Sequence, residues 1–174
     1  RRALNHAVNK EEIVEYVLSG LAEISDSPIS SVIWGYHPTG TYEYDPQKAK
    51  QLLAEAGYPN GLSISLWTPV GRYLQDLAVS EVIQEQLSRI GVNVRVETWE
   101  FGAYIEEIKK GEFDMVLLGW SPSTGDADWG LYPVFPSSQW PPQSNRAHYA
   151  NPEVDALLVA RLIAAGTAPT YRVE

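Results

Sequence analysis

The sequence predicts an α/β fold in which helices flank a mostly parallel sheet. Strand-like segments occupy 62–67, 92–98 and 113–119, and helix-like segments at 73–90 and 104–110 lie between them. Strands and helices that alternate in this way form βαβ units, and the crossover helix makes the two strands of each unit parallel. The length of 174 residues is that of about one domain, so we expect a single domain over 1–174.

The composition excludes several classes of function. The 13 basic residues are scattered and the formal net charge is −9, so the chain lacks the basic surface that binds nucleic acid. It has no cysteine, which excludes disulfides, thiolate metal sites and cysteine nucleophiles. Its apolar runs are far shorter than the stretch of about 20 residues that a membrane-spanning helix needs.

The first segment, 1–9, has the spacing of a short helix. Asn9 is placed to cap a second helix, and Glu12 would complete a capping box with it. We expect this second helix to end near Gly20. The chain begins on Arg1 without a methionine and already in a helical pattern, which indicates a fragment excised from a longer protein.

The segment 21–44 has no regular period and is rich in serine, proline, glycine and aromatic residues. We expect a long ordered loop over the domain. The apolar side chains expected to be buried beneath it are Ile29, Val32, Ile33 and Trp34.

The clearest helix signal is YDPQKAKQLLAEAGYP. Asp45 is the expected N-cap and Pro46 fits the first turn. Gly57 supplies the C-terminal stop, with Pro59 beyond it. Its apolar stripe is Ala49, Leu52, Leu53 and Ala56.

The middle of the chain supplies the sheet. LSISLW, 62–67, alternates apolar residues with serine, as expected of a strand with one buried face. The helix 73–90 carries an apolar stripe, and VNVRVET, 92–98, alternates again. The inward residues expected of the helix are Val79, Val82, Ile83, Leu87 and Ile90. A last helix, NPEVDALLVARLIAA, begins with the cap Asn151 and Pro152.

A candidate site follows from the predicted sheet, because parallel α/β sheets bind ligands beyond the carboxyl ends of their strands. Three strand-end loops should therefore meet at one rim. They contribute Trp67, Arg72, Trp99, Glu100, Trp120, Asp126, Asp128 and Trp129. Aromatic walls with a few charged groups are typical of a small-molecule site.

Structural explanations compete with this interpretation. A single tryptophan is more often a packing residue than a ligand wall. Asp126 fits equally well as the cap of a turn before Trp129, and the spacing alone slightly favours Arg72 as a solvated loop residue. It is the gathering of these residues at one predicted edge that favours a binding site.

Catalytic patterns are weaker. Asp126 and Asp128 match the D-x-D of metal-dependent sugar transferases and could form a glycosidase pair, although the first of these acids comes only seven positions after Gly119. The three histidines lack metal-ligand spacing, and no glycine-rich phosphate loop is present. We therefore expect no catalytic residue, no metal and no cofactor.

Several long segments resemble the extracytoplasmic solute-binding proteins of peptide-type ABC transporters, the family 5 binders of dipeptides, oligopeptides and glutathione. They are RRALNHAVNKEEIVEYVLSG, YEYDPQKAKQLLAEAGYPNG, VIQEQLSRIGVNVRVETWEFGAYIEEIKKGEFDMVLLGW and HYANPEVDALL. Within that family, GWSPSTGDADWGLYPVF followed by SSQWPP is most similar to the glutathione-binding branch.

The resemblance implies a lobe of the periplasmic-binding-protein type II kind. This chain would be most of the C-terminal lobe of a two-lobed receptor that closes around a small peptide or glutathione. The partners implied are the remaining lobe or lobes and the ABC permease subunits. The location implied is periplasmic or extracytoplasmic, with a signal sequence, and any lipid anchor, in an N-terminus absent from this sequence.

The resemblance also assigns residues. Family members bind the peptide ammonium with an aspartate three positions after the tryptophan, where this chain has Ser123. Asp126 takes that role if the loop carries an insertion, and Asp128 is the alternative. Arg72 matches a basic residue directed toward the ligand carboxylate. The last matched positions, on the family's Asn-to-Tyr rim, are Asn145 and Tyr149.

Two other functions stay open at this point. One is a carbohydrate-active enzyme or sugar transferase that uses Asp126 and Asp128. The other is an oligosaccharide receptor of the same family, since the six tryptophans would suit stacking on sugars.

Overall fold

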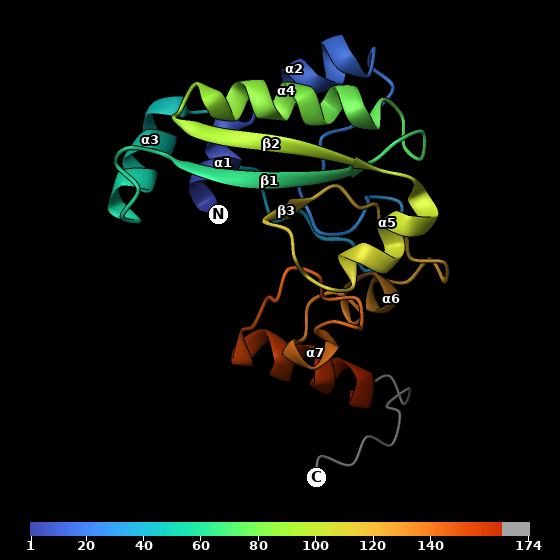
Figure 1. Cartoon of the computed structure of the whole chain (residues 1–174). Helices are drawn as coiled ribbons and strands as arrows, with labels where there is room; N and C mark the ends of the chain where they lie inside the picture. The colour runs from blue at the N-terminus through green and yellow to red at the C-terminus, as the bar shows by residue number, and fades with distance from the viewer. Residues whose placement is uncertain (165–174) are drawn as a thin grey trace. The chain divides into compact units, whose positions relative to one another are not determined.

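The structure, a computed structural model, describes residues 1–164 (Figure 1). The described chain divides into two compact units: unit 1 comprises 1–26, 39–108 and 112–119, and unit 2 comprises 27–38, 109–111 and 120–164. In chain order the elements are α1 (Arg2–Ala7), α2 (Lys10–Glu12), the π-helix η1 (Ile13–Val17), α3 (Pro46–Glu55), β1 (Leu62–Pro69), α4 (Asp76–Ser88), β2 (Val92–Trp99), α5 (Phe101–Ile108), β3 (Met115–Val116), α6 (Ala127–Leu131), the 3-10 helix η2 (Ser137–Gln139) and α7 (Pro152–Ala164).

Unit 1 contains the predicted parallel sheet. Its strands lie in the order β2-β1-β3. β1 and β2 pair in parallel over their whole length, from Leu62 opposite Val92 to Pro69 opposite Trp99. β3 pairs in parallel with the other edge of β1. The prediction of an α/β fold with parallel strands is confirmed.

The alternation of residues along β1 separates two hydrophobic clusters. Leu66 belongs to the larger cluster, which α1, α3 and α4 complete with Ala7, Ala49 and Leu87. Trp67 belongs to a smaller aromatic cluster on α5. Figure 1 shows α4 running lengthwise beside β2, as the crossover of a βαβ unit must.

Strand β3 is much shorter than the predicted 113–119. On either side of β3, side-chain hydrogen bonds contact the segments that were expected to extend the strand. Asp114 Oδ2 accepts hydrogen bonds from the backbone N (2.7 Å) and hydroxyl (3.0 Å) of Ser65. Beyond β3, the Tyr104 hydroxyl lies 2.6 Å from the carbonyl oxygen of Leu117 and 3.1 Å from that of Trp67. One backbone bond also continues the pairing beyond β3, from Leu117 N to Trp67 O at 2.9 Å. The regular strand is nevertheless limited to β3, so the strand pattern overstated its length.

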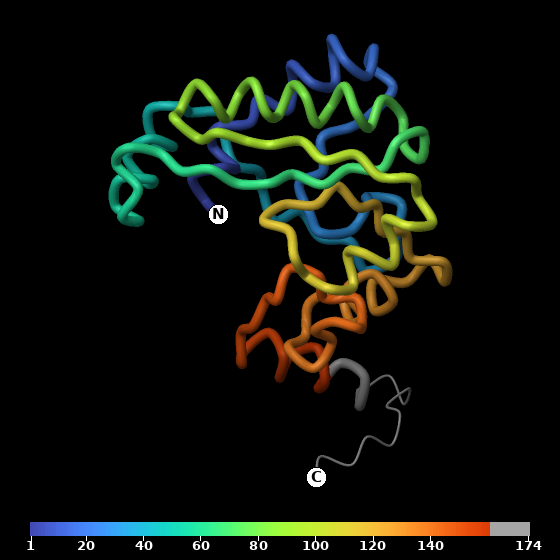
Figure 2. Tube along the Cα trace, viewed as in Figure 1, coloured from blue at the N-terminus to red at the C-terminus, as the bar shows by residue number. Residues whose placement is uncertain are grey.

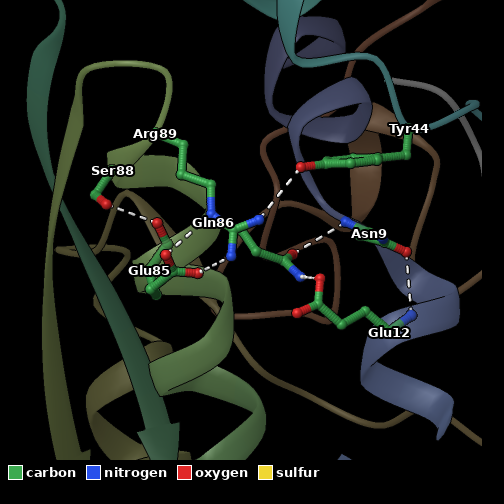
Figure 3. A network of polar contacts seen from close by, with 7 residues as sticks. All are labelled: Asn9, Glu12, Tyr44, Glu85, Gln86, Ser88 and Arg89. Atoms are coloured by element: carbon green, nitrogen blue, oxygen red, sulfur yellow. Dashed lines mark hydrogen bonds and ion pairs between the residues drawn. The ribbon is translucent and has the colours of Figure 1, made fainter. Parts of the chain in front are cut away.

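The predicted capping box at the N-terminus is half present (Figure 3). Asn9 Oδ1 accepts the bond from the backbone N of Glu12, at 3.1 Å, as predicted. The return bond is made by another residue: the backbone N of Asn9 donates to Gln86 Oε1 at 3.0 Å, and Gln86 Nε2 donates to Glu12 Oε2 at 3.1 Å. Gln86, on α4, therefore replaces the short-range contact with a long-range one.

The loop 21–44 forms no helix or strand, and Figure 2 shows its irregular course. Ile29 is buried, but the side chains of Val32 and Trp34 are 85% and 71% exposed. The expectation that the loop buries all four of its apolar residues is therefore wrong. Trp34 instead uses its backbone, which forms an isolated parallel bridge with Asp126.

The caps predicted for the two clearest helices are confirmed. Asp45 accepts a bond from the backbone N of Lys48 at 2.9 Å, at the start of α3. Asn151 accepts one from the backbone N of Glu153 at 3.0 Å, at the start of α7. Residue 165, the end of the predicted last helix, lies outside the described residues. Within residues 1–164, no helix has the length and apolar character needed to cross a membrane.

Candidate ligand-binding site

In unit 1, the loops that follow β1 and β2 meet as predicted. Arg72 lies in the first loop, and Phe101 opens α5 directly after β2. The guanidinium carbon of Arg72 stands 4.6 Å from the centroid of the Phe101 ring and 5.8 Å from that of Tyr73. A cation at this distance over an aromatic face is attracted by the ring quadrupole.

Tyr73 joins the end of the third strand to the same rim. Its hydroxyl accepts a hydrogen bond from the backbone N of Gly119 at 2.9 Å, and its ring packs edge-on against Phe101. A side chain on Gly119 would place its Cβ 2.9 Å from Tyr73 Cε1. Glycine is therefore needed where the chain leaves unit 1.

Arg72 is exposed, and no carboxylate lies within ion-pair distance of it in the part of the chain that the structure describes. Glu100, the acid that directly precedes Phe101 in sequence, is directed to the start of α5, where it accepts a bond from the backbone N of Ala103 at 3.2 Å. Backbone N–H groups of Gly102 and Ala103 hold the pKa of Glu100 below its ordinary value. Arg72 thus contacts the ring of Phe101, while the acid that precedes this ring in sequence is bonded to the helix backbone.

Trp99 occupies a different position from the one expected of a ligand wall. Its ring centroid lies 5.0 Å from that of Trp67, within the aromatic cluster of unit 1. The indole nitrogens of both residues are buried and have no acceptor among the described residues. The structure therefore places Trp99 in the packing of unit 1.

The other six candidate residues belong to unit 2. Asp126 is the N-cap of α6, and its Oδ1 accepts a bond from the backbone N of Asp128 at 2.7 Å. The loop is held on both sides by Trp34, which donates to Gly125 O at 3.0 Å and accepts from Ala127 N at 2.9 Å. The structural role considered for Asp126, the cap at the start of α6, is present.

Trp120 and Trp129 are joined by a bond from the indole Nε1 of Trp120 to the backbone oxygen of Trp129, at 3.2 Å. Their side chains remain 44% and 46% exposed. The polar edge of the Trp120 indole is satisfied by the protein, which leaves apolar ring surface for another molecule.

Asn145 and Tyr149 also lie together, but their contacts are internal. Asn145 is fully buried. Its Nδ2 lies 2.9–3.0 Å from the carbonyl oxygens of Phe135, Pro136 and Tyr149, and its Oδ1 accepts from Tyr149 N at 3.1 Å. The amide of Asn145 is thus committed to the shape of this loop, and Tyr149 is the member of the pair that keeps partial exposure.

Sequence reasoning missed three residues of the unit 1 rim: Tyr73, Asp76 and Phe101. Asp76 accepts bonds from the backbone N of Gly71, Arg72, Tyr73 and Leu77. A signal was present, since an aspartate four positions after Arg72 is a residue type that often binds loop N–H groups. Phe101 carried no such signal, because an aromatic residue after a strand is more often a core residue.

Among residues 1–164, no three histidine or carboxylate side chains gather as a metal site would require.

Comparison with known sequences identifies a family. The sequence model of the bacterial extracellular solute-binding proteins, family 5, in its middle part, matches residues 1–142.

Two curated relatives cover most of this chain. This chain is 39% identical to the glutathione-binding protein GsiB of Pectobacterium atrosepticum over 171 residues. The aligned region covers 93% of this chain and 32% of that protein. Over 162 residues this chain is 41% identical to heme-binding protein A of Haemophilus influenzae, covering 91% and 29%. The chain therefore spans about a third of the length of these relatives.

Solved structures of the same kind are similar over nearly the whole chain. The periplasmic binding protein DppA of Helicobacter pylori, in complex with the peptide STSA, has a TM-score of 0.85 and 32% identity, covering 96% of this chain and 32% of that one. A dipeptide-binding protein of Pseudoalteromonas sp. SM9913, in complex with Met-Leu, has a TM-score of 0.82 and 33% identity, covering 90% and 32%.

Proposed function

The chain belongs to the family 5 bacterial extracellular solute-binding proteins, and on this premise we propose that it forms part of a receptor for peptide-like solutes. The receptor binds a dipeptide, an oligopeptide or glutathione and delivers it to an ABC import permease. Its chemistry is binding, without a catalytic step. The names of its relatives support this class of ligand, since they include a glutathione-binding protein and proteins solved with STSA and Met-Leu.

One observation carries the proposal: the exposed guanidinium of Arg72, which lies on the ring of Phe101 and has no carboxylate partner in residues 1–164. A cation held by an aromatic ring, with no carboxylate partner among the described residues, suits a carboxylate that arrives from outside. Arginine binds carboxylates through two parallel hydrogen bonds, which also fixes the orientation of the ligand. We assign Arg72 to the carboxylate of the solute.

Asp126 is our candidate for the ammonium end of the solute, with Asp128 as the alternative. The cap bond to Asp128 N uses Oδ1 of Asp126 and fixes its direction at the start of α6. A charge pair about 4 Å apart at an effective dielectric near 20 is worth on the order of 4 kcal/mol before desolvation. A ligand with a free ammonium would use Asp126, whereas a ligand without one would not need it.

Trp120 and Trp129 would cover the side chains of the solute. Ring surfaces bury apolar groups of many shapes without selecting one, because the contact is not directional. This arrangement suits a receptor with broad specificity. Tyr149 would be a further contact on the same unit.

The remaining lobe or lobes of the full-length receptor would close over the ligand, and the whole receptor would act outside the cytoplasm. An isolated piece that supplies part of the contacts should bind weakly, because the rest of the ligand stays in water.

The experiment that tests the function is a titration of the full-length receptor, followed by intrinsic tryptophan fluorescence. The ligands are glutathione, a neutral dipeptide, the same dipeptide with a C-terminal amide, and cellobiose. Saturation by glutathione or the free dipeptide, with at least tenfold weaker binding of the amide, supports the proposal; a tenfold ratio corresponds to about 1.4 kcal/mol.

Arg72→Gln provides the matched test of the residue. It should lower the affinity for the free dipeptide by roughly 10- to 100-fold, since a hydrogen bond to a charged group contributes about 1.5–3 kcal/mol. The affinity for the amide should stay almost unchanged. Response to cellobiose alone would make the indoles a sugar platform and would overturn the peptide proposal.

A further inference from the structure

Asp76 holds the loop that carries Arg72. Its side chain is 5% exposed. Its Oδ2 accepts hydrogen bonds from the backbone N of Arg72 (2.9 Å) and Tyr73 (3.0 Å), and its Oδ1 accepts from Gly71 N (3.2 Å) and Leu77 N (2.9 Å). A carboxylate surrounded by four backbone donors is fully occupied and cannot itself receive a ligand.

These bonds are more than a helix cap. An N-cap residue precedes the helix and bonds to its second or third N–H group. Asp76 is instead the first residue of α4, and three of its four bonds reach back to the loop before the helix. The residue in the N-cap position, Gln75, has a left-handed φ of 53° and makes no side-chain cap bond. Strain of this kind persists only where neighbouring contacts impose it.

The bonds from Asp76 fix the loop backbone at Arg72 and Tyr73 and so orient these two side chains. The backbone of Arg72 is fixed by the 2.9 Å bond to Asp76, and its guanidinium then lies 4.6 Å from the Phe101 centroid. The backbone of Tyr73 is fixed by the 3.0 Å bond, and its hydroxyl meets Gly119 N at 2.9 Å. One carboxylate thus sets the positions of the cation and of the connection to the third strand.

We propose that Asp76 is a positioning residue of the carboxylate subsite: it binds no ligand and holds Arg72 in the orientation that receives the carboxylate of the solute. The inference rests on the proposed function, because it takes Arg72 as the cation of that subsite. A long arginine side chain on a flexible loop would lose much of its freedom on binding, and a held loop reduces that loss.

Asp76→Asn tests the inference in the full-length receptor. Asparagine keeps the size of the side chain, but its amide nitrogen cannot accept from the loop N–H groups. The measurement is the ratio of the dissociation constants of a neutral dipeptide with a C-terminal amide and the same dipeptide with a free carboxylate. We expect this ratio to fall by about tenfold in Asp76→Asn, while the affinity for the amide stays within about threefold of wild type.

Asp114→Asn is the matched control, since Asp114 also accepts a backbone N–H in unit 1 but holds β1 to the start of β3. It should lower stability and leave the ratio unchanged. Arg72→Gln should abolish the carboxylate preference, and adding Asp76→Asn to it should lower the ratio no further, because the two residues act on one subsite.

The outcomes separate the two claims. If Arg72→Gln keeps the wild-type ratio, the carboxylate subsite of the proposed function is wrong. If Arg72→Gln abolishes the preference while Asp76→Asn keeps it, Arg72 stands and the role of Asp76 is overturned. Should Asp76→Asn fail to fold, Asp76→Ser retains an acceptor oxygen, and its ratio should fall between those of wild type and Arg72→Gln. A wild-type ratio in folded Asp76→Ser overturns the inference equally.

Discussion

The guanidinium carbon of Arg72 lies 4.6 Å from the ring centroid of Phe101, the first residue of the helix that follows the neighbouring strand. The contact joins the carboxyl ends of β1 and β2, which the register places side by side at Pro69 and Trp99. The contact orients the positive charge but, unlike an ion pair, does not neutralise it. The consequence is a cation available to an anionic ligand.

Replacing Phe101 by leucine should lower the affinity for a carboxylate ligand by about two- to fivefold. Leucine keeps the apolar contact but has no ring quadrupole, and an exposed cation–π contact contributes about 0.5–1 kcal/mol. Titration of the full-length receptor with a dipeptide and its amide measures the effect, which should appear only for the free carboxylate. Phe101→Tyr is the matched control because it keeps a ring, and an equal loss in both variants would contradict the role of the cation–π contact.

Two substitutions of Asp126 separate its cap from its charge. Asp126→Asn should leave stability unchanged, because asparagine caps helices as well as aspartate does. It should still lower the affinity for a peptide with a free ammonium by more than about threefold, and should leave the affinity for the N-acetylated peptide unchanged. Asp126→Ala should show the same loss of affinity and, in addition, about 1 kcal/mol less stability from the lost cap. If Asp126→Asn binds both peptides like wild type, Asp126 is only a cap.

Local patterns are enough to predict much of unit 1 and the start of α7 in unit 2. The alternation in 62–67 and 92–98 specified two strands, and helices that lie between such strands make them parallel. Asp45 and Asn151 were identified as caps because a cap bond joins residues two or three positions apart. The rim that joins Arg72 to the next strand followed from the same parallel order.

The features that the sequence did not reveal depend on distant partners. The capping box at Asn9 was predicted with Glu12, but Gln86 makes the return bond from 77 positions away. The third strand was overextended because Tyr104 replaces part of its ladder. Val32 and Trp34 were expected to be buried from their apolarity alone, and apolar side chains are also common at surfaces.

Gln86→Leu should reduce the stability of the chain by about 1–3 kcal/mol. Leucine has a similar size, but it leaves the backbone N of Asn9 and the carboxylate of Glu12 without the partners drawn in Figure 3. Urea unfolding followed by tryptophan fluorescence measures the change. Gln51→Leu is the matched control, since Gln51 also donates to a glutamate, Glu55, but from an exposed helix face. Equal stability of Gln86→Leu and Gln51→Leu would rule out a stabilising role for the buried amide.

The stability that Asp76 contributes should disappear in acid. Burial raises the pKa of its carboxyl, but the N–H groups of Tyr73, Arg72, Gly71 and Leu77 together outweigh burial and hold the pKa below the ordinary value of 3.8. A lowered pKa in the folded state means that the unfolded chain binds the proton more readily, so this contribution is fully present above the ordinary pKa and is lost as pH falls through the folded one.

Asp76→Asn should therefore be about 1–3 kcal/mol less stable than wild type at pH 7, and the difference should shrink steadily below about pH 4. Urea unfolding of both proteins at pH 7, 5, 4 and 3 measures it, and the other carboxylates cancel because they are common to both. A difference that stays constant down to pH 3 would mean that the four backbone bonds do not depend on the charge of Asp76, and that the loop around Arg72 is held by other contacts.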